Sequence, residues 1–481
     1  MSRSILIILS LLFFPILIHA QEIPVTEEQQ LETITEVTES DIEDEMLLQQ
    51  LQYYIENPLN LNAATEEELR SLFILTDLQI YNLLQYRKLA GVLVSIYELQ
   101  AVPSWNLSTI KRVLPYVTIS VRMDAAQTLL ERLRGGKHFL MLRASKLLQK
   151  QKGYDKTLST HYLGSNEQLQ LRYKYQHKNL LQFGIVADKD AGEEFFKGSQ
   201  QKGFDFYSFH LFARKIGIVK ALALGDFTVN MGQGLIQWQS FAFKKSADAM
   251  FIKRQASVLN PYSSAGEFYF NRGAGASFHI GNVEATVFGG YRKFSGNLVN
   301  DTMSNETYFS SFQTSGYHRS ASEFADRNRI GQISFGGTVG YRRSDYTVNL
   351  NTVHYNFSKA IQKRSEPYNQ FAIQGNRWSN YSIDYSITYK NLHFFGEAAI
   401  DKNVSTAFVN GMQMSVDPKV DISLLYLNIS PEYQAVFGNA FTESTVPSNE
   451  RGFYTGITLR PVNGWRVDAY ADFFQFPWLK Y

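Results

Sequence analysis

The sequence contains no cysteine, which excludes disulfides, thiolate metal sites, a cysteine nucleophile and a lipidated N-terminal cysteine. Long apolar runs are also missing. After residue 20 no window holds 18 consecutive apolar residues, so a bundle of membrane helices is excluded. Neither sign of charge dominates, because 47 Lys and Arg are balanced by 45 Asp and Glu. The net charge of +2 therefore gives no overall field directed at nucleic acid.

Catalytic motifs are absent as well. There is no His-Glu-x-x-His or Gly-x-Ser-x-Gly string, and the nine histidines show no paired ligand spacing. The string Gly273-Ala274-Gly275 falls in a predicted strand, where glycines indicate close packing or a bend rather than a phosphate loop. We predict no catalytic residues, no metal and no cofactor. A Ser–His site assembled by the fold is the remaining enzymatic alternative.

The N-terminal 69 residues divide into segments of different composition. Arg3, an apolar core over 5–18 and Ala20 predict a secretory signal peptide over residues 1–20, with an uncleaved anchor as the alternative. Residues 21–69 carry 14 Asp or Glu and no Lys or Arg. We expect 21–41 to be an acidic disordered tether. Helical periodicity begins near Ile42 and runs to Glu56.

Residues 42–122 are expected to form a small helical domain. The stretch 61–69, Leu-Asn-Ala-Ala-Thr-Glu-Glu-Glu-Leu, has the acidic first turn of a helix start, and Tyr86-Arg87 follows. This region resembles the tandem helix-hairpin-helix domain of the competence protein ComEA and its relatives. The resemblance implies DNA capture. However, the two hairpins at 73–76 and 103–106 lack the glycines that let backbone N–H groups approach a phosphate.

The acidic stretch would also repel a phosphate backbone. We therefore prefer a structural or protein-docking role for the helical domain and keep DNA binding as the alternative.

From residue 135 to 481 the chain is predicted to be strand and loop. Residues 381–390 alternate strictly between Tyr or Ile and polar side chains, and 167–175 follow the same period of two. We predict fifteen strands, near 137–149, 166–176, 179–188, 205–215, 218–228, 266–280, 282–293, 329–343, 345–357, 379–390, 392–400, 405–415, 419–429, 451–460 and 465–475. Short turns and longer links alternate along this series, which is typical of outer-membrane barrels.

The predicted fold is an all-β transmembrane barrel of about 14–16 antiparallel strands, preceded by a small all-α helix-hairpin-helix-like domain. A soluble β-sandwich is the alternative. Fifteen is an odd number, whereas single-chain bacterial barrels have an even one. A strand hidden at 235–243 or 250–258, or an incomplete end near Pro477, would explain the difference.

If the Tyr and aliphatic faces meet lipid, the opposite faces line the lumen. The residues expected there are Arg172, Lys174, Glu284, Asp384, Glu397, Arg466, Asp468 and Asp472. They carry both signs of charge, so strong ion selectivity is not implied, and mutual pairing is the plainer interpretation.

Two of the longer links stand out. The apolar loop 229–265, which contains Trp238, is expected to fold into the lumen as a constriction. The loop 294–328 offers His318, Arg319 and Arg327 to a carbohydrate, peptide or anion, with a mobile surface loop as the simpler alternative.

The whole layout resembles Bacteroidetes outer-membrane proteins with an N-terminal helix-hairpin-helix domain. We predict a channel or transporter in contact with outer-membrane lipid, whose helical domain lies in the periplasm and docks a periplasmic protein or caps the pore. DNA uptake and a non-transporting envelope scaffold are the other two hypotheses.

Overall fold

A computed structural model describes residues 50–120, 128–242, 245, 248–300, 307–462 and 465–480. The expected signal peptide and tether lie outside the described residues. So does the first part of the predicted helix from residue 42, whereas 50–56 are helical.

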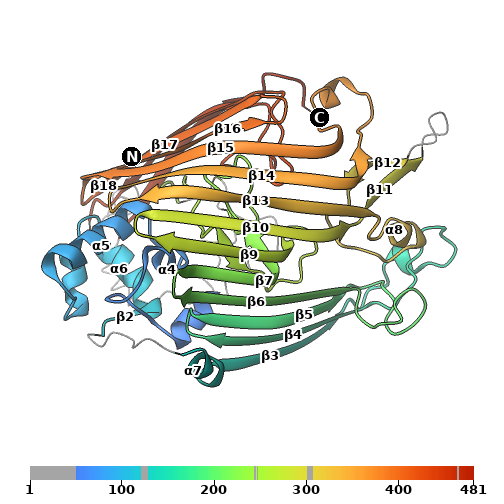
Figure 1. The fold of residues 1–481 in the computed structure, drawn as a ribbon, viewed down its shortest axis with the longest axis horizontal. Coiled ribbons are helices and arrows are strands. Elements are labelled where there is room, and N and C mark those ends of the chain that lie inside the picture. The colour runs from blue at the N-terminus through green and yellow to red at the C-terminus, as the bar shows by residue number, and fades with distance from the viewer. Residues whose placement is uncertain are drawn as a thin grey trace, which may run out of the picture.

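Eighteen strands of the described part form one mostly antiparallel sheet that closes into a barrel, and its long strands run side by side in Figure 1. The fifteen long strands are β3 (Lys137–Lys146), β4 (Glu167–His177), β5 (Leu181–Lys189), β6 (Phe206–Ile216), β7 (Val219–Val229), β9 (Asn271–Ile280), β10 (Val283–Phe294), β13 (Ile330–Arg342), β14 (Tyr346–Ile361), β15 (Gly375–Tyr389), β16 (Leu392–Asp401), β17 (Thr406–Asp417), β18 (Val420–Ile429), β19 (Glu450–Leu459) and β20 (Val467–Gln475). The three short ones are β8 (Leu259–Pro261), β11 (Gly296–Asn300) and β12 (Thr307–Phe312).

The barrel confirms the predicted fold class. Each of the fifteen predicted strands overlaps one long strand. The predicted count of 14–16 was too low because β8, β11 and β12 are only three to six residues long, too short to show a period of two. Within the described residues, neither 235–243 nor 250–258 forms a strand. The strands form a single ring rather than two packed sheets, so the β-sandwich alternative was wrong.

Short and long connections lie at opposite ends of the barrel. The turns at 178–180, 217–218 and 281–282 are short, and Gly281 adopts a φ of 62°, which glycine takes at no steric cost. The long connections run to the other end, where α8 (Ala321–Ala325) and the 3-10 turns η3 (Lys152–Tyr154) and η4 (Pro367–Asn369) occur. Figure 1 shows the helices of the N-terminal region at the short-turn end and α8 at the other.

The helical region, residues 50–120, comprises α4 (Glu66–Arg70), α5 (Asp77–Ala90), η1 (Ile96–Ala101), α6 (Leu107–Val113) and η2 (Leu114–Tyr116), with a parallel pair of short strands, β1 (Leu59–Asn60) and β2 (Val117–Thr118). Thr65 and Thr76 begin α4 and α5 with capping boxes, each reciprocated by the side chain three residues on. Leucines that are fully buried form its core. No helix in the described part is both long and apolar enough to cross a membrane.

One further helix, α7 (Leu129–Arg134), precedes β3. The buried guanidinium of Arg132 donates to the carbonyl oxygens of Arg214 and Lys215 at 2.6 and 2.9 Å. The hydroxyl of Tyr175 donates to the carbonyl oxygen of Arg132 at 2.6 Å. The helix is thereby fixed to the short-turn ends of β4 and β6.

The two faces of the barrel wall differ in chemistry. Val339, Leu350 and Ile383 form one cross-strand row and are exposed by 56, 62 and 46%. On the inner face Asn351 donates to Ser382 and Asp384 at 3.1 and 2.7 Å. The barrel is therefore apolar outside and polar at these inner positions.

Candidate functional site

The described part of the loop between β7 and β8, residues 230–242, 245 and 248–258, runs inside the barrel and fills part of its lumen; we call this loop the plug loop. Met231, Leu235, Ile236 and Ile252 are almost fully buried. They belong to one apolar cluster with inward side chains of the wall, among them Val353, Phe395, Val409, Leu425 and Leu427, and with Tyr433, Phe437 and Phe441 of the loop after β18. The predicted insertion of this loop into the lumen agrees with its position.

Hydrogen bonds from the wall hold the first turn of the plug loop. One carboxylate oxygen of Glu397 accepts from the backbone N–H groups of Gln233 and Leu235 at 2.7 and 3.0 Å. Gly232 has a φ of 54°, and a Cβ there would lie 2.5 Å from the carboxyl carbon of Glu397. Glycine is thus required at this turn for conformation and for space. Tyr355 donates to the side chain of Gln237.

The helical region contacts the plug loop directly. Nζ of Lys253 lies 3.0 Å from Oδ2 of Asp77, and Gln255 donates to the same oxygen at 3.0 Å. The rings of Phe73 and Phe241 meet edge to face, with centroids 5.6 Å apart. Burial alone would raise the pKa of Asp77, but Arg70 and Lys253 lower it well below its usual value.

The acidic first turn of α4 meets basic residues at the short-turn rim of the barrel. Glu66 pairs with Arg342 at 3.4 Å, Glu67 with Lys220 at 2.5 Å and Glu68 with Lys215 at 3.3 Å. Burial would raise the pKa of each carboxyl, yet nearby cations, with Arg70 contributing most at Glu66, leave all three pKa values below normal. The acidity of this stretch is therefore complementary to the barrel rim.

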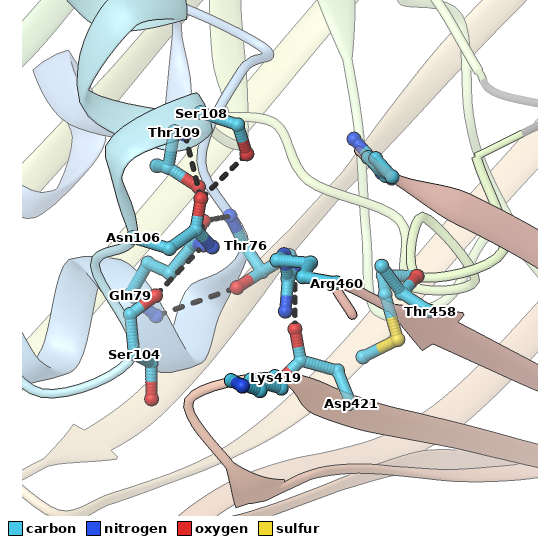
Figure 2. Close-up of polar contacts among 12 residues, drawn as sticks. Thr76, Gln79, Ser104, Asn106, Ser108, Thr109, Lys419, Asp421, Thr458 and Arg460 are labelled. Atoms are coloured by element: carbon cyan, nitrogen blue, oxygen red, sulfur yellow. Dashed lines mark hydrogen bonds and ion pairs between the residues drawn. The ribbon is translucent and has the colours of Figure 1, made fainter. Parts of the chain in front are cut away.

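The two hairpins of the helical region face the barrel, as Figure 2 shows. Gln79, in the first turn of α5, donates to the carbonyl oxygen of Ser104 in the second hairpin at 3.2 Å. Across from them, Arg460, which directly follows β19, pairs with Asp421 of β18 at 2.5 Å. The cavity left between the hairpins, the plug loop and the wall is only ≈ 20 Å³, about the space of one water molecule.

A much larger cavity of ≈ 1050 Å³ occupies the part of the lumen beside β3 to β7. At one end it is lined by Tyr53 and Glu67 of the helical region, and at the other by Tyr317 and Arg319 of the long loops. Between these ends the lining is rich in amide side chains, namely Gln168, Gln170, Gln176, Gln182, Gln239 and Gln255. One side of the lumen is therefore filled by an apolar plug, and the other contains a polar passage.

Buried charges gather where the long loops meet. His318 Nδ1 lies 2.6 Å from Oδ2 of Asp205, and Arg327 lies 3.2 Å from Oδ1. Glu193 accepts from the backbone N–H of His318 at 2.8 Å. Glu193, Asp205 and His318 could each offer one ligand atom to a metal. However, 2.6 Å is the length of a charge-assisted hydrogen bond, and Arg327 already neutralises Asp205, so the trio fits an ion pair better than a metal site.

Burial, followed by the charge of Asp205, raises the pKa of Glu193 to about 8. Nearby, the guanidinium of Arg319 lies between the rings of Tyr162 and Tyr317, at 4.8 and 3.9 Å from their centroids, and pairs with Glu323 at 3.0 Å.

The residues expected in the lumen occupy different surroundings. Arg172 is buried on the inner face, and Lys174 lines the passage. Asp384 accepts from Asn349 and Asn351, whereas Glu397 holds the plug loop. Glu284 lies near the rim, 2.7 Å from Lys220.

The three expected residues at the end of the chain also have partners. Arg466 pairs with Asp468 and with Asp248 of the plug loop, both at 2.7 Å, and Asp472 contacts Lys245. Arg466 precedes β20 rather than lying in it. A functional role for any of these residues stays a prediction.

Of the four loop residues expected to bind a ligand, His318, Arg319 and Arg327 come together and Trp238 does not. Trp238 is 2% exposed within the plug loop, and its indole donates to the carbonyl oxygen of Phe241 at 3.2 Å. Sequence reasoning missed the contact between Asp77 and Lys253, because an acidic first turn is explained equally well by the helix dipole. It also missed Glu193 and Asp205, which lie more than 100 residues from His318.

Comparison with known proteins gives solved structures only. No family model matches the chain, and no curated protein matches it. OprB of Pseudomonas putida, solved at high pH, is 10% identical with a TM-score of 0.33, over 72% of this chain and 90% of OprB. An anion-selective porin from Comamonas acidovorans is 12% identical with a TM-score of 0.29, over 65% and 79%. Salmonella typhi OmpF in complex with daunomycin is 11% identical with a TM-score of 0.29, over 70% and 88%. The fold assignment rests on the strand pairing described above.

Proposed function

We propose that the chain is an outer-membrane channel in which solutes move through the polar passage beside β3 to β7 while the plug loop closes the rest of the lumen. The observation that carries the proposal is the ≈ 1050 Å³ cavity that extends from the helical region to the long loops. The exposed apolar row on β13, β14 and β15 supports contact with lipid, because a water-soluble barrel gains nothing from exposing such side chains.

The helical region acts as a cap at the periplasmic mouth. Three observations support this role: the ion pairs of α4 with the rim, the contact of Asp77 with Lys253, and the contribution of Tyr53 and Glu67 to the wall of the passage. The expected signal peptide and the short turns at the same end, which are periplasmic in outer-membrane barrels, support a periplasmic location for the cap.

The cap also exposes apolar side chains to solvent. Leu89, Val94 and Tyr97 are exposed by 86, 75 and 76%. Such a surface supports docking of a periplasmic protein, which would draw the cap from the mouth. We do not favour DNA at the hairpins, because their side chains already contact the barrel and the plug loop.

Single-channel recording tests the proposal. Because the sequence contains no cysteine, an introduced cysteine is the one thiol that a reagent can modify. Gln170→Cys places a thiol in the passage, and Ser334→Cys places one on the inner face of the filled side. In planar bilayers, a charged methanethiosulfonate reagent should reduce the current of Q170C and leave that of S334C unchanged. An absence of conductance in the unmodified chain, or equal block of both variants, would refute the passage.

A further inference from the structure

The passage described above is lined by charged groups toward both of its ends, and one group at each end has no ion-pair partner among the described residues. Toward the helical region, the ammonium of Lys174 and the guanidinium of Arg214 line the cavity. Among the described residues no carboxylate lies within ion-pair distance of Lys174, whose ammonium lies 6.0 Å from the ring centroid of Tyr53. Arg214, in contrast, lies near the carboxylates of Glu67 and Glu68 and lowers the pKa values of both. An uncompensated cation such as Lys174 in a confined space favours an anionic group from outside.

Toward the long loops, the lining carries the opposite charge. Asp188, Asp190 and Glu267 all face the cavity there. No donor within the described ranges reaches the carboxylate of Glu267, and burial together with the charges of Asp205 and Glu193 raises its pKa well above the usual value. An ammonium group entering this end would relieve that repulsion. Two cations line the same end: Arg143, in the row of Gln170 and Asp188, and Arg319, which is paired with Glu323.

The strand register gives the separation of the two ends. Asp188 pairs with Gln170 on β4, and Lys174 is four residues further along the same strand. At roughly 3.3 Å per residue, the rows of Asp188 and Lys174 are about 13 Å apart. An extended peptide spans at most about 3.3–3.6 Å per residue, so about four residues fit between them. Arg214 lies farther toward the helical region and would meet longer chains.

The wall between the two ends suits peptide groups. Gln170, Gln182 and Gln239 present amides, which both donate and accept hydrogen bonds and so match the N–H and C=O groups of an extended chain. Phe241 and Tyr262 add rings that can contact side chains of the ligand. A neutral saccharide could form hydrogen bonds with the amides, but it has no charged groups to pair with those at the two ends.

From this charge pattern we infer that the passage binds short peptides of about four residues with free termini, the ammonium end toward Glu267 and the carboxylate end toward Lys174. The inference rests on the proposed passage and names its substrate class. Carbohydrate, the other ligand considered for the loops, is an outcome of the test rather than a second proposal.

Calorimetry on the full chain in detergent tests the inference without requiring the cap to open. Tetra-alanine should bind, and N-acetyl tetra-alanine amide should bind at least about tenfold more weakly, because each charge-assisted contact is worth about that factor or more. Lys174→Gln should weaken tetra-alanine by about the same factor. It should leave the affinity for the C-terminally amidated peptide unchanged, since that contact is already lost. Lys363→Gln, at an exposed position in another loop, is the matched control.

Equal affinity for the free and blocked peptides, or binding of maltotetraose but not of tetra-alanine, overturns the peptide assignment. Glu267→Gln provides a second check at the other end. In this variant, N-acetylation of the peptide should no longer change its affinity. If peptides fail to bind while Q170C still conducts and its current is reduced by the methanethiosulfonate reagent, the proposed channel is supported and only the substrate class is wrong. If the chain does not conduct, the proposed passage itself fails.

Discussion

Nζ of Lys253, in the plug loop, lies 3.0 Å from Oδ2 of Asp77, in the first turn of α5. Both side chains are buried, and Arg70 donates to the other oxygen of the same carboxylate at 2.6 Å. The contact joins two segments that the sequence separates by most of the barrel's first half. This contact therefore links the cap to the plug loop, and a substitution at Asp77 should affect both.

We expect Asp77→Asn to loosen the cap. The substitution leaves the buried Lys253 without its ion-pair partner and Arg70 paired with Glu66 alone. Breaking a buried pair in this way costs about 3–5 kcal/mol. Hydrogen exchange of the α5 amides should accelerate, and the mean conductance in planar bilayers should rise. Asp345→Asn, at an exposed turn position, is the control and should change neither quantity. Unchanged exchange in D77N would show that the cap is held by other contacts.

A second prediction concerns the anchor of the plug loop. Glu397→Ala removes the acceptor of two buried backbone N–H groups, at Gln233 and Leu235, and each unsatisfied donor costs about 1–3 kcal/mol. The plug loop should become mobile, and single-channel current should become noisier. Glu397→Gln keeps one acceptor oxygen and should lie between the wild type and E397A. If E397Q is as noisy as E397A, the loss of charge rather than of the acceptor is responsible.

The barrel could be predicted from the sequence, and the arrangement inside it only in part. Period-two alternation is a property of each strand alone, so all fifteen long strands were predictable. The apolar character of 229–265 likewise predicted burial, because exposing such a loop to water would be unfavourable. The passage could not be foreseen, because it depends on which side of the lumen the plug loop occupies. That choice is made by contacts such as those of Glu397 and Lys253, which join residues far apart in the chain.

The short strands were not predicted from the sequence, for a different reason. β11 (Gly-Asn-Leu-Val-Asn) and β12 (Thr-Tyr-Phe-Ser-Ser-Phe) do not alternate strictly between polar and apolar side chains, so a search for a period of two does not find them. The hairpins of the helical region illustrate a similar limit. Phe73 and Ser104 take φ values of 54° and 63°, the region that favours glycine, so the hairpins predicted at 73–76 and 103–106 adopt a conformation that their composition does not indicate.

Stability should depend on pH through Glu193. Its pKa is raised from 4.5 to about 8, so the folded state binds this proton more tightly than the unfolded state does. The stabilisation is complete below the unfolded value and is lost as the pH rises through about 8. Thermal unfolding followed by the gel shift of heated samples should therefore show a lower transition at about pH 9 than at about pH 5.

Glu193→Gln imitates the protonated carboxyl and still accepts a hydrogen bond through its oxygen. The variant should resemble the wild type at low pH and exceed it in stability at high pH. Glu366→Gln, an exposed carboxylate in another loop, should follow the wild type. A pH slope that persists unchanged in E193Q would assign the dependence to another group in the loops.

The last prediction concerns the outer face of the barrel. Leu350 is 62% exposed and lies between Val339 and Ile383 in a cross-strand row. If this row meets hydrocarbon, Leu350→Arg should destabilise the protein folded into lipid vesicles by about 2–4 kcal/mol, because a charge is costly near the bilayer midplane. Leu350→Phe keeps the surface apolar and should have little effect. If the row faced water instead, Leu350→Arg would cost little stability, since arginine is harmless at a water-exposed strand position. An L350R variant as stable as the wild type in vesicles would therefore place this row outside the membrane, and would leave the barrel without the lipid contact on which the channel proposal depends.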